Sequence, residues 1–259
     1  MHSQQKHSPR RFQPLNSDLR NAQTADTNVH GKSYQLPVLK GIVFDVDGTL
    51  CEPQNYMFGQ MRTVLNIDKS VDILDHLHSL PEDKQADAME AIRAIEHDAM
   101  IKQTPQAGLV ELMEYLELRG LRKGICTRNL DTPVNHLIDN FLNGKIFSPI
   151  VTREFRPPKP DPAGILHIAE NWGLDDRGNS LIMVGDSVDD MTAGYKAGAA
   201  TVLLVNEVNA HLARHEHTDL CITRLDELID ILERGFEGQI ALDDENPDTR
   251  AQAERALPS

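Results

Sequence analysis

The segment Leu39-Lys-Gly-Ile-Val-Phe44-Asp45-Val-Asp47-Gly48-Thr49 passes from an apolar run directly into two acidic residues. A short apolar run followed by turn-forming residues is typical of a strand that is buried on both faces. In an open parallel sheet, ligands bind outside the carboxyl ends of the strands. The segment therefore predicts a central strand that delivers two carboxylates to a site. The alternative is an ordinary strand-to-turn sequence, because Asp and Gly are common in turns.

Further apolar runs alternate with helical patterns along the chain. Residues 181–184 and 201–205 are predicted as buried strands, and residues 121–126 and 149–152 are weaker candidates. Apolar residues at helical spacing predict helices at 109–116, 161–172 and 225–232. Strands that alternate with helices favour right-handed βαβ units. We therefore expect an α/β protein with a Rossmann-like, three-layer α/β/α core built on a parallel sheet.

Residues 52–104 interrupt this alternation, because they contain no good strand. The pattern Ser79-Leu-Pro-Glu82 resembles a capping box and precedes a helix with Met89, Ile92, Ile95 and Ala99 on one face. Residues 64–80 also look helical. We expect a small helical cap at 52–104, inserted into a core formed by 38–51 and 105–235.

The two ends of the chain differ from this middle region in composition. Residues 1–37 are rich in Ser, Gln, Asn and charged residues, which predicts a disordered leader. Residues 236–259 have a surplus of acidic residues, which predicts a solvated acidic tail.

Composition excludes several classes of protein. The chain has 259 residues, of which 40% are hydrophobic and 25% charged, as in ordinary globular proteins. A net charge of −14 argues against binding to nucleic acid. Three scattered cysteines form no disulfide pattern, and no apolar run suits a membrane span. These features predict a cytoplasmic protein, with a mitochondrial location as the alternative, and a monomer is favoured.

A second predicted strand also ends in acidic residues, in Gly185-Asp186-Ser187-Val-Asp189-Asp190. If the two strands are neighbours, Asp186 lies close to Asp45, and such carboxylates repel one another without a cation. Mg²⁺ accepts oxygen ligands of this kind and is common in phosphate chemistry. The alternative is a helix N-terminus enriched in acids, which could account for Asp189 and Asp190.

Two weaker signals lie between these strands. Thr127-Arg128-Asn129 follows a predicted strand, where a hydroxyl and free backbone N–H groups suit an anion. Lys159 lies among prolines in a stiff loop that can direct its ammonium at a phosphate. The alternative for the first signal is an ordinary helix cap, and the alternative for Lys159 is a solvated loop lysine.

The order and spacing of these residues resemble the haloacid dehalogenase (HAD) superfamily. The residues that match its motifs are Asp45-x-Asp47-Gly48-Thr49, Thr127, Lys159 and Gly185-Asp186-Ser187-x-x-Asp190. The resemblance covers about residues 38–235 and is greatest to the phosphoglycolate-phosphatase-like group, whose cap is inserted after the first strand. Within that group the chain looks most like uncharacterised fungal and plant hydrolases.

The resemblance implies a role for each matching residue. Asp45 would attack phosphorus to form an aspartyl-phosphate, and Asp47 would act as general acid and then general base. Mg²⁺ would be bound by Asp45, Asp186 and the backbone carbonyl of Asp47. The substrate phosphate would be bound by Thr127, Arg128 and Lys159, and supporting positions would be Gly48, Thr49, Asn129, Gly185, Ser187 and Asp190, the last against either Lys159 or the metal.

These roles predict a Mg²⁺-dependent phosphatase acting on a small phosphorylated metabolite. Asp47 favours phosphoryl transfer over dehalogenation, because an alkoxide needs a proton on leaving whereas a halide does not. Two alternatives stay open: a sugar-phosphate mutase, and a non-catalytic phosphate-binding or regulatory protein on the same scaffold. The cap would select the leaving group, and the sequence does not identify that group.

Overall fold

A parallel six-stranded sheet forms the centre of the computed structural model, which describes residues 10–26 and 36–238. The strand order is β3-β2-β1-β4-β5-β6, which places β1 between β2 and β4. The strands are β1 (Gly41–Phe44), β2 (Arg122–Cys126), β3 (Ile150–Val151), β4 (Leu181–Gly185), β5 (Ala200–Leu204) and β6 (Leu220–Ile222). The predicted three-layer α/β/α fold is confirmed.

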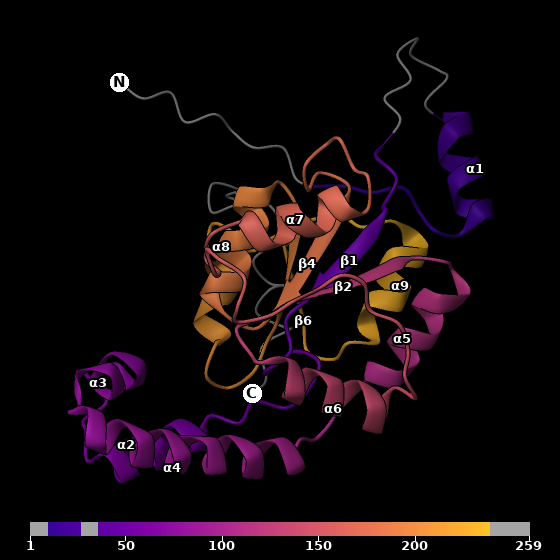
Figure 1. Ribbon diagram of the computed structural model, residues 1–259. Helices are drawn as coiled ribbons and strands as arrows, with labels where there is room; N and C mark the ends of the chain where they lie inside the picture. The colour runs from indigo at the N-terminus through magenta and orange to yellow at the C-terminus, as the bar shows by residue number, and fades with distance from the viewer. Residues whose placement is uncertain (1–9, 27–35, 239–259) are drawn as a thin grey trace, which may run out of the picture.

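Helices cover both faces of the sheet (Figure 1). On one face, α7 packs against β2 and β3, and α8 packs against β4 and β5. On the other face, α5 contacts β2 and α9. The helices of the core are α5 (Leu109–Leu118), α6 (Asp131–Phe141), α7 (Ala163–Asn171), α8 (Val188–Ala197) and α9 (Glu227–Arg234), with a 3₁₀ helix, η2, at Ala210–Arg214. No helix within the described residues is both long and apolar enough to span a membrane.

The side chains of β1 alternate between the two layers of the core. Ile42 and Phe44 belong to the cluster that contains the buried residues of α5 and α9. Val43 belongs to the opposite cluster, which contains Ile165 of α7 and Met183 of β4. All four residues of β1 are buried, as expected for a central strand with helices on both faces. This packing anchors the end of β1, where the acidic residues begin.

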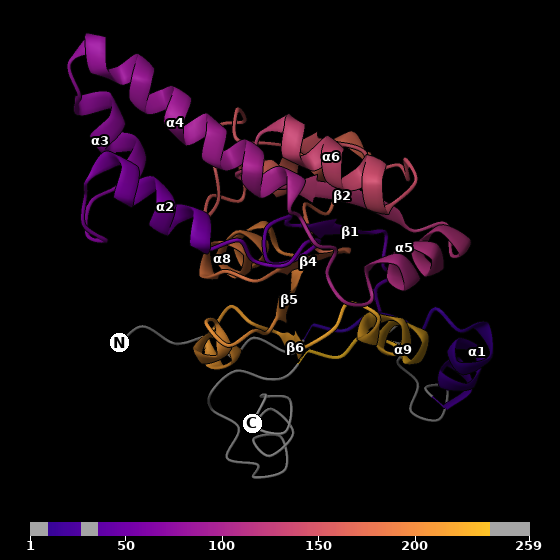
Figure 2. The same cartoon turned by 90° about the horizontal axis from the view of Figure 1, so that it is seen from below.

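Three helices follow β1 and extend away from the sheet (Figures 1 and 2). They are α2 (Tyr56–Leu65), α3 (Ile73–Ser79) and α4 (Glu82–Ile101), and their apolar residues Met61, Leu77 and Ile92 form a separate buried cluster. Figure 2 shows α4 running alongside α6, and the two helices are in contact. This group lies within the predicted cap, residues 52–104.

Two details of the cap differ from the sequence predictions. Residues 64–80 are not one helix, because Asn66 adopts a left-handed conformation (φ 51°) that ends α2, and α3 begins only at Ile73. The expected capping box is also absent. Pro81 occupies the N-cap of α4 without a side-chain bond, and the hydroxyl of Ser79 donates to the carbonyl of His76 (2.7 Å).

The prediction of a disordered leader is wrong for its described part. Phe12 is 2% exposed and packs against Phe236, with 5.8 Å between ring centroids. The backbone N–H of Phe12 donates to the carbonyl of Phe236 (2.9 Å), and that of Leu15 donates to Leu232 (2.9 Å). The short α1 (Ser17–Asp26) follows. Residues 1–9, 27–35 and 239–259, which include most of the predicted acidic tail, lie outside the described residues.

Candidate active site

The carboxyl ends of three adjacent strands bring the predicted site residues together. Asp45 follows β1, Thr127 follows β2 and Asp186 follows β4. In the parallel register, Phe44 pairs with Ile125 on one side and with Val184 on the other, so the residues after these strands meet at one edge of the sheet. The backbone N–H of Asp45 also donates to the carbonyl of Val184 (3.0 Å), and this hydrogen bond holds the backbone of Asp45 against β4.

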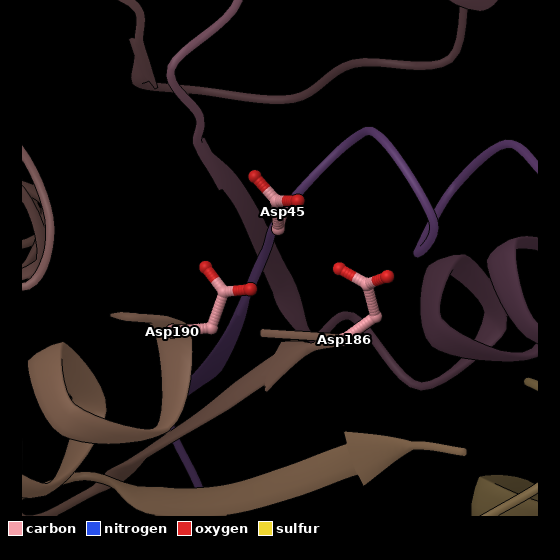
Figure 3. A group of neighbouring side chains, drawn as sticks. All are labelled: Asp45, Asp186 and Asp190. Carbon is pink, nitrogen blue, oxygen red and sulfur yellow. The ribbon is translucent and has the colours of Figure 1, made fainter. Parts of the chain in front are cut away.

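Three aspartates form an acidic cluster at this edge. Asp45, Asp186 and Asp190 each have a carboxylate oxygen within 4.8 Å of the others, and Asp190 and Asp45 are 0% and 7% exposed. Figure 3 shows the three carboxylates arranged around a common space. Asp190 comes from the first turn of α8, immediately after the loop that carries Asp186. Buried carboxylates this close repel one another unless cations neutralise them.

Lys159 supplies one of the positive charges that the cluster requires. Its ammonium lies 2.7 Å from Oδ1 of Asp45 and 2.5 Å from Oδ1 of Asp190, and the residue is 6% exposed. Although burial lowers the pKa of Lys159, Asp190 and Asp45 outweigh this effect and raise the pKa above its ordinary value. The lysine is therefore charged, yet one ammonium faces three carboxyl groups.

Two carboxyl groups of the cluster have raised pKa values. Burial raises the pKa of Asp45 to about 7, although Lys159 opposes the shift. Burial likewise raises the pKa of Asp186 to about 8, and the nearby Asp45 and Asp190 add to the shift. Without a further cation, these two groups ionise only near neutral pH. A bound divalent cation would remove this penalty.

The donor atoms of the cluster fit a hard divalent cation such as Mg²⁺. Asp190 is already engaged through both oxygens, since Oδ1 accepts from Lys159 and Oδ2 accepts from the backbone N–H and hydroxyl of Ser187 (3.1 and 2.6 Å). Asp45 and Asp186 are the members with carboxylate oxygen left to offer, and oxygen ligands are those that Mg²⁺ prefers. Of the two roles expected for Asp190, the contact with Lys159 is present in the structure.

Asp47 lies beside the cluster and is half-buried. The thiol of Cys51 donates to its Oδ1 at 3.7 Å. Burial raises the pKa of Asp47, and hydrogen bonds from Cys51 and Asn129 oppose that rise. Asp47 also lines a pocket of about 240 Å³ between the core and α4. A carboxyl group in this position can exchange a proton with a molecule in the pocket.

The predicted supporting residues shape the loops that hold these groups. Ser187 and Asp190 form the capping box of α8, in which the N–H of Asp190 donates to the Ser187 hydroxyl (3.3 Å). The hydroxyl of Thr127 accepts from the backbone N–H of Asn129 (3.2 Å) and lies at a buried position. The hydroxyl of Thr49 is fully buried and has no hydrogen-bond partner among the described residues. The remaining two, Gly48 and Gly185, are both buried and lie in close contact with Asp186 and Asp190 respectively.

Arg128 is not drawn into the cluster, although the sequence predicted a role in phosphate binding. Its guanidinium pairs with the carboxylate of Asp189 at 2.8 Å, and its side chain is 60% exposed. The sequence analysis treated Asp189 as an acid at a helix N-terminus. Its partner Asp189 belongs to the first turn of α8 and has a side chain that is 26% exposed, so the pair lies outside the buried cluster.

Two residues of the site were missed by the sequence analysis. The amide of Asn209 donates to the backbone carbonyl of Asp186 (2.7 Å), and that of Asn206 donates weakly to its Oδ2 (3.4 Å). Asn206 follows the predicted strand at 201–205, so the rule that strand ends carry site residues would have included it. Asn209 carries no such signal, because its contact depends on the shape of the loop.

The fold and the site define an α/β protein with a buried acidic cluster and a lysine at the carboxyl ends of its central strands. Residues 39–198 match the family model described as haloacid dehalogenase-like hydrolase. The chain belongs to this family, as its motifs suggested.

Curated relatives and solved structures agree with this assignment. An uncharacterized hydrolase of Saccharomyces cerevisiae is 46% identical over 199 residues, which are 75% of this chain and 90% of the yeast protein. A haloacid dehalogenase-like hydrolase domain-containing protein of Arabidopsis thaliana is 38% identical over 64% of this chain and 71% of its own length. A solved structure of a predicted phosphoglycolate phosphatase from Haemophilus somnus superposes with a TM-score of 0.61, at 20% identity, and covers 74% of this chain and 97% of that one. The expected resemblance to phosphoglycolate-phosphatase-type folds and to fungal and plant hydrolases is confirmed.

Proposed function

We propose that this chain is a Mg²⁺-dependent phosphatase that hydrolyses a small phosphomonoester through an aspartyl-phosphate on Asp45. The observation that carries the proposal is the pairing of Lys159 with Asp45 and Asp190 inside a buried carboxylate cluster, with Asp47 at the edge of a pocket. Relatives of lower identity include a pyrophosphatase of Bacillus velezensis (27% identical) and a phosphoglycolate phosphatase of Rhodospirillum rubrum (29% identical over 98 residues), which supports phosphate chemistry.

Each residue in the proposed mechanism has a role that its position allows. A carboxylate oxygen of Asp45 attacks phosphorus while the bond from phosphorus to the leaving oxygen breaks. Asp47 gives its proton to that oxygen and later removes a proton from the water that hydrolyses the aspartyl-phosphate. Lys159 and Thr127 bind the phosphoryl oxygens. Mg²⁺, held by Asp45 and Asp186 with the backbone carbonyl of Asp47, would neutralise charge on the transferring group.

The proposal is tested by hydrolysis of para-nitrophenyl phosphate with and without Mg²⁺, using the parent and Asp45→Asn. The variant keeps the size of the side chain and removes the nucleophile, so turnover should fall to background. Asp189→Asn is the matched control, because Asp189 pairs with Arg128 on the surface. We expect the control to retain at least half of the parent rate.

Equal residual rates in the parent and Asp45→Asn would contradict the proposal. Trapping of ³²P from a labelled phosphomonoester on the parent, and its absence on Asp45→Asn, would support the covalent intermediate directly. Return of the phosphoryl group to a sugar phosphate rather than to water would favour a mutase, and phosphate binding without turnover would favour a non-catalytic role.

A further inference from the structure

The pocket beside Asp47 is largely apolar. Met57 of α2 and Met100 of α4 contribute to one side, and Leu130 and Pro133, at the start of α6, contribute to the other. Because Asp47 is the proposed proton donor to the leaving oxygen, the leaving group must extend from Asp47 into this pocket. The pocket lining therefore holds information about the substrate.

The charged groups that line the pocket are not all paired with one another. Its lining includes two carboxylates, those of Asp47 and Glu96. Glu96 pairs with Arg153 at 3.5 Å, and Nε of Arg153 also donates to the carbonyl of Arg128 at 2.9 Å. Arg93 also lines the pocket, and it forms no hydrogen bond or ion pair within the part of the chain that the structure describes. The guanidinium of Arg93 is therefore available to bind an anionic group of a ligand.

Arg93 lies on α4 about two helical turns before the C-terminal end of that helix. The amide of Gln54 donates to the carbonyl of Ala99 (2.6 Å), which ties the last turn of α4 to the segment that follows Cys51. Arg93 lies six residues before Ala99, or about 9 Å further along the helix axis. Figure 2 shows α4 leading away from β1 and past α6 in that direction.

We infer that the substrate is a phosphomonoester whose leaving group carries a second anionic group, separated from the ester oxygen by an apolar spacer of several carbon atoms and bound by Arg93. This inference rests on the proposed phosphatase function and names its substrate class. The guanidinium binds carboxylate or phosphate through two parallel hydrogen bonds, so either group could be the distal anion. His97, one helical turn from Arg93, also lines the pocket and can donate to the same anion. The spacer contacts the methionines and Leu130.

The experiment compares kcat/KM for phosphate esters of ω-hydroxy acids with two, four and six carbons, in the presence of Mg²⁺. Neutral alkyl phosphates of equal length and the corresponding α,ω-bisphosphates form the other two arms. We expect the four- or six-carbon anionic esters to exceed their neutral counterparts by about tenfold or more, the effect of a hydrogen-bonded charge. The arm with the higher value, carboxylate or bisphosphate, identifies the distal group.

Arg93→Gln should lower kcat/KM at least tenfold more for the preferred anionic ester than for the neutral one, and Arg93→Lys should recover part of that preference. Lys84→Gln is the matched control, because it removes one positive charge from α4 at an exposed position outside the pocket. It should leave the preference intact.

The outcomes separate this inference from the proposed function. Hydrolysis of para-nitrophenyl phosphate by the parent, without preference for anionic esters, would overturn the inference and leave the phosphatase proposal standing. A preference that peaks at two carbons, or equal losses for anionic and neutral esters in Arg93→Gln, would overturn it as well. Absence of Mg²⁺-dependent hydrolysis of every ester would overturn both.

Discussion

A Cβ atom on Gly48 would lie 2.1 Å from Oδ2 of Asp186, so the loop after β1 is in direct contact with the carboxylate that follows β4. The backbone of Gly48 also has a positive φ of 78°. We expect Gly48→Ala to displace Asp186 from the cluster. Because displacements of about 1 Å cost roughly a hundredfold in rate, phosphatase activity should fall by about that factor. Steady-state kinetics with varied Mg²⁺ would measure the loss and show whether more metal is needed.

Gly120→Ala is the matched control for this variant. Gly120 also has a positive φ (64°), yet no atom lies within 4 Å of the position its Cβ would take. This change therefore tests backbone strain alone, which costs about 1 kcal/mol of folding stability. Equal losses of activity in the two variants would show that contact with Asp186 is unimportant.

Lys159→Met should destabilise the fold as well as abolish phosphate binding. The substitution keeps an apolar chain of similar length but leaves Asp45 and Asp190 without their buried ammonium. Removal of one partner from a buried ion pair typically costs about 3 to 5 kcal/mol of unfolding free energy. Urea unfolding without Mg²⁺ would measure the change.

The double variant Lys159→Met with Asp190→Asn should lose less stability than the sum of the single changes, because each removes the other's unpaired charge. Lys145→Met serves as the surface comparison, since Lys145 pairs with the exposed Glu117. We expect little measurable effect there. Additive losses at Lys159 and Asp190 would mean that the two residues do not interact in solution.

Mg²⁺ binding should depend on pH in the range where the cluster ionises. Burial raises the pKa of Asp45 to about 7 and that of Asp186 to about 8, against about 4 in an unfolded chain. Between about pH 4 and pH 8, Asp45 and Asp186 of the metal-free folded protein therefore keep protons that the same groups release in the unfolded chain. Its stability therefore falls as pH rises from about 4 to about 8, and Mg²⁺, which binds the ionised form, should restore it.

The measurement is the thermal unfolding midpoint with and without saturating Mg²⁺. We expect the difference between the two midpoints to be small at about pH 5.5 and to grow up to about pH 8.5. A variant with Asn at positions 45 and 186 should show neither the shift nor its pH dependence. A shift of equal size at both pH values would indicate that the metal binds elsewhere or that these carboxyl groups are already ionised.

Local sequence patterns were enough to predict the centre of this protein. The strand that ends at Phe44 and the strand that ends at Gly185 were predicted from apolar runs, and their parallel pairing follows from the helices between them. Once the two strands are neighbours, Asp45 and Asp186 must meet. The meeting of Asp45 and Asp186 was therefore predictable on the condition that β1 and β4 are neighbours, whereas the role of Asp190 was left open.

The features that were missed depend on contacts between distant segments or on weak patterns. β6 has only three residues at the sheet edge, too few for a periodic signal. α6 was not predicted, although Val134, Leu137 and Ile138 have helical spacing and are buried. The ion pair joins Arg128, in the loop after β2, to Asp189 in the first turn of α8, and no pattern within either segment reveals it.

The N-terminal segment is the clearest case of a contact that composition conceals. Phe12 lies among polar residues in the sequence, yet it is 2% exposed because it packs on Phe236, which is itself 1% exposed. We expect Phe12→Ala to lower the unfolding free energy by about 3 kcal/mol, as removal of a buried aromatic ring does. The ring packs on Phe236, which follows α9, and not on the carboxyl ends of β1 and β4, where the acidic cluster lies. At temperatures at which the variant is folded, its kcat toward para-nitrophenyl phosphate should therefore change less than twofold.

Leu19→Ala on α1 separates the effect of the docked ring from that of any apolar residue in the segment. Leu19 is 42% exposed, so truncating its side chain creates no buried cavity. The unfolding free energy should therefore change by less than about 0.5 kcal/mol. If Phe12→Ala also left the unfolding free energy unchanged, the N-terminal segment would not pack on the core in solution. In that case α9 and Phe236 would have to be stable without it. A loss confined to Phe12→Ala would instead show that the N-terminal segment completes the core, because its backbone hydrogen bonds to Phe236 and Leu232 place the ring over α9.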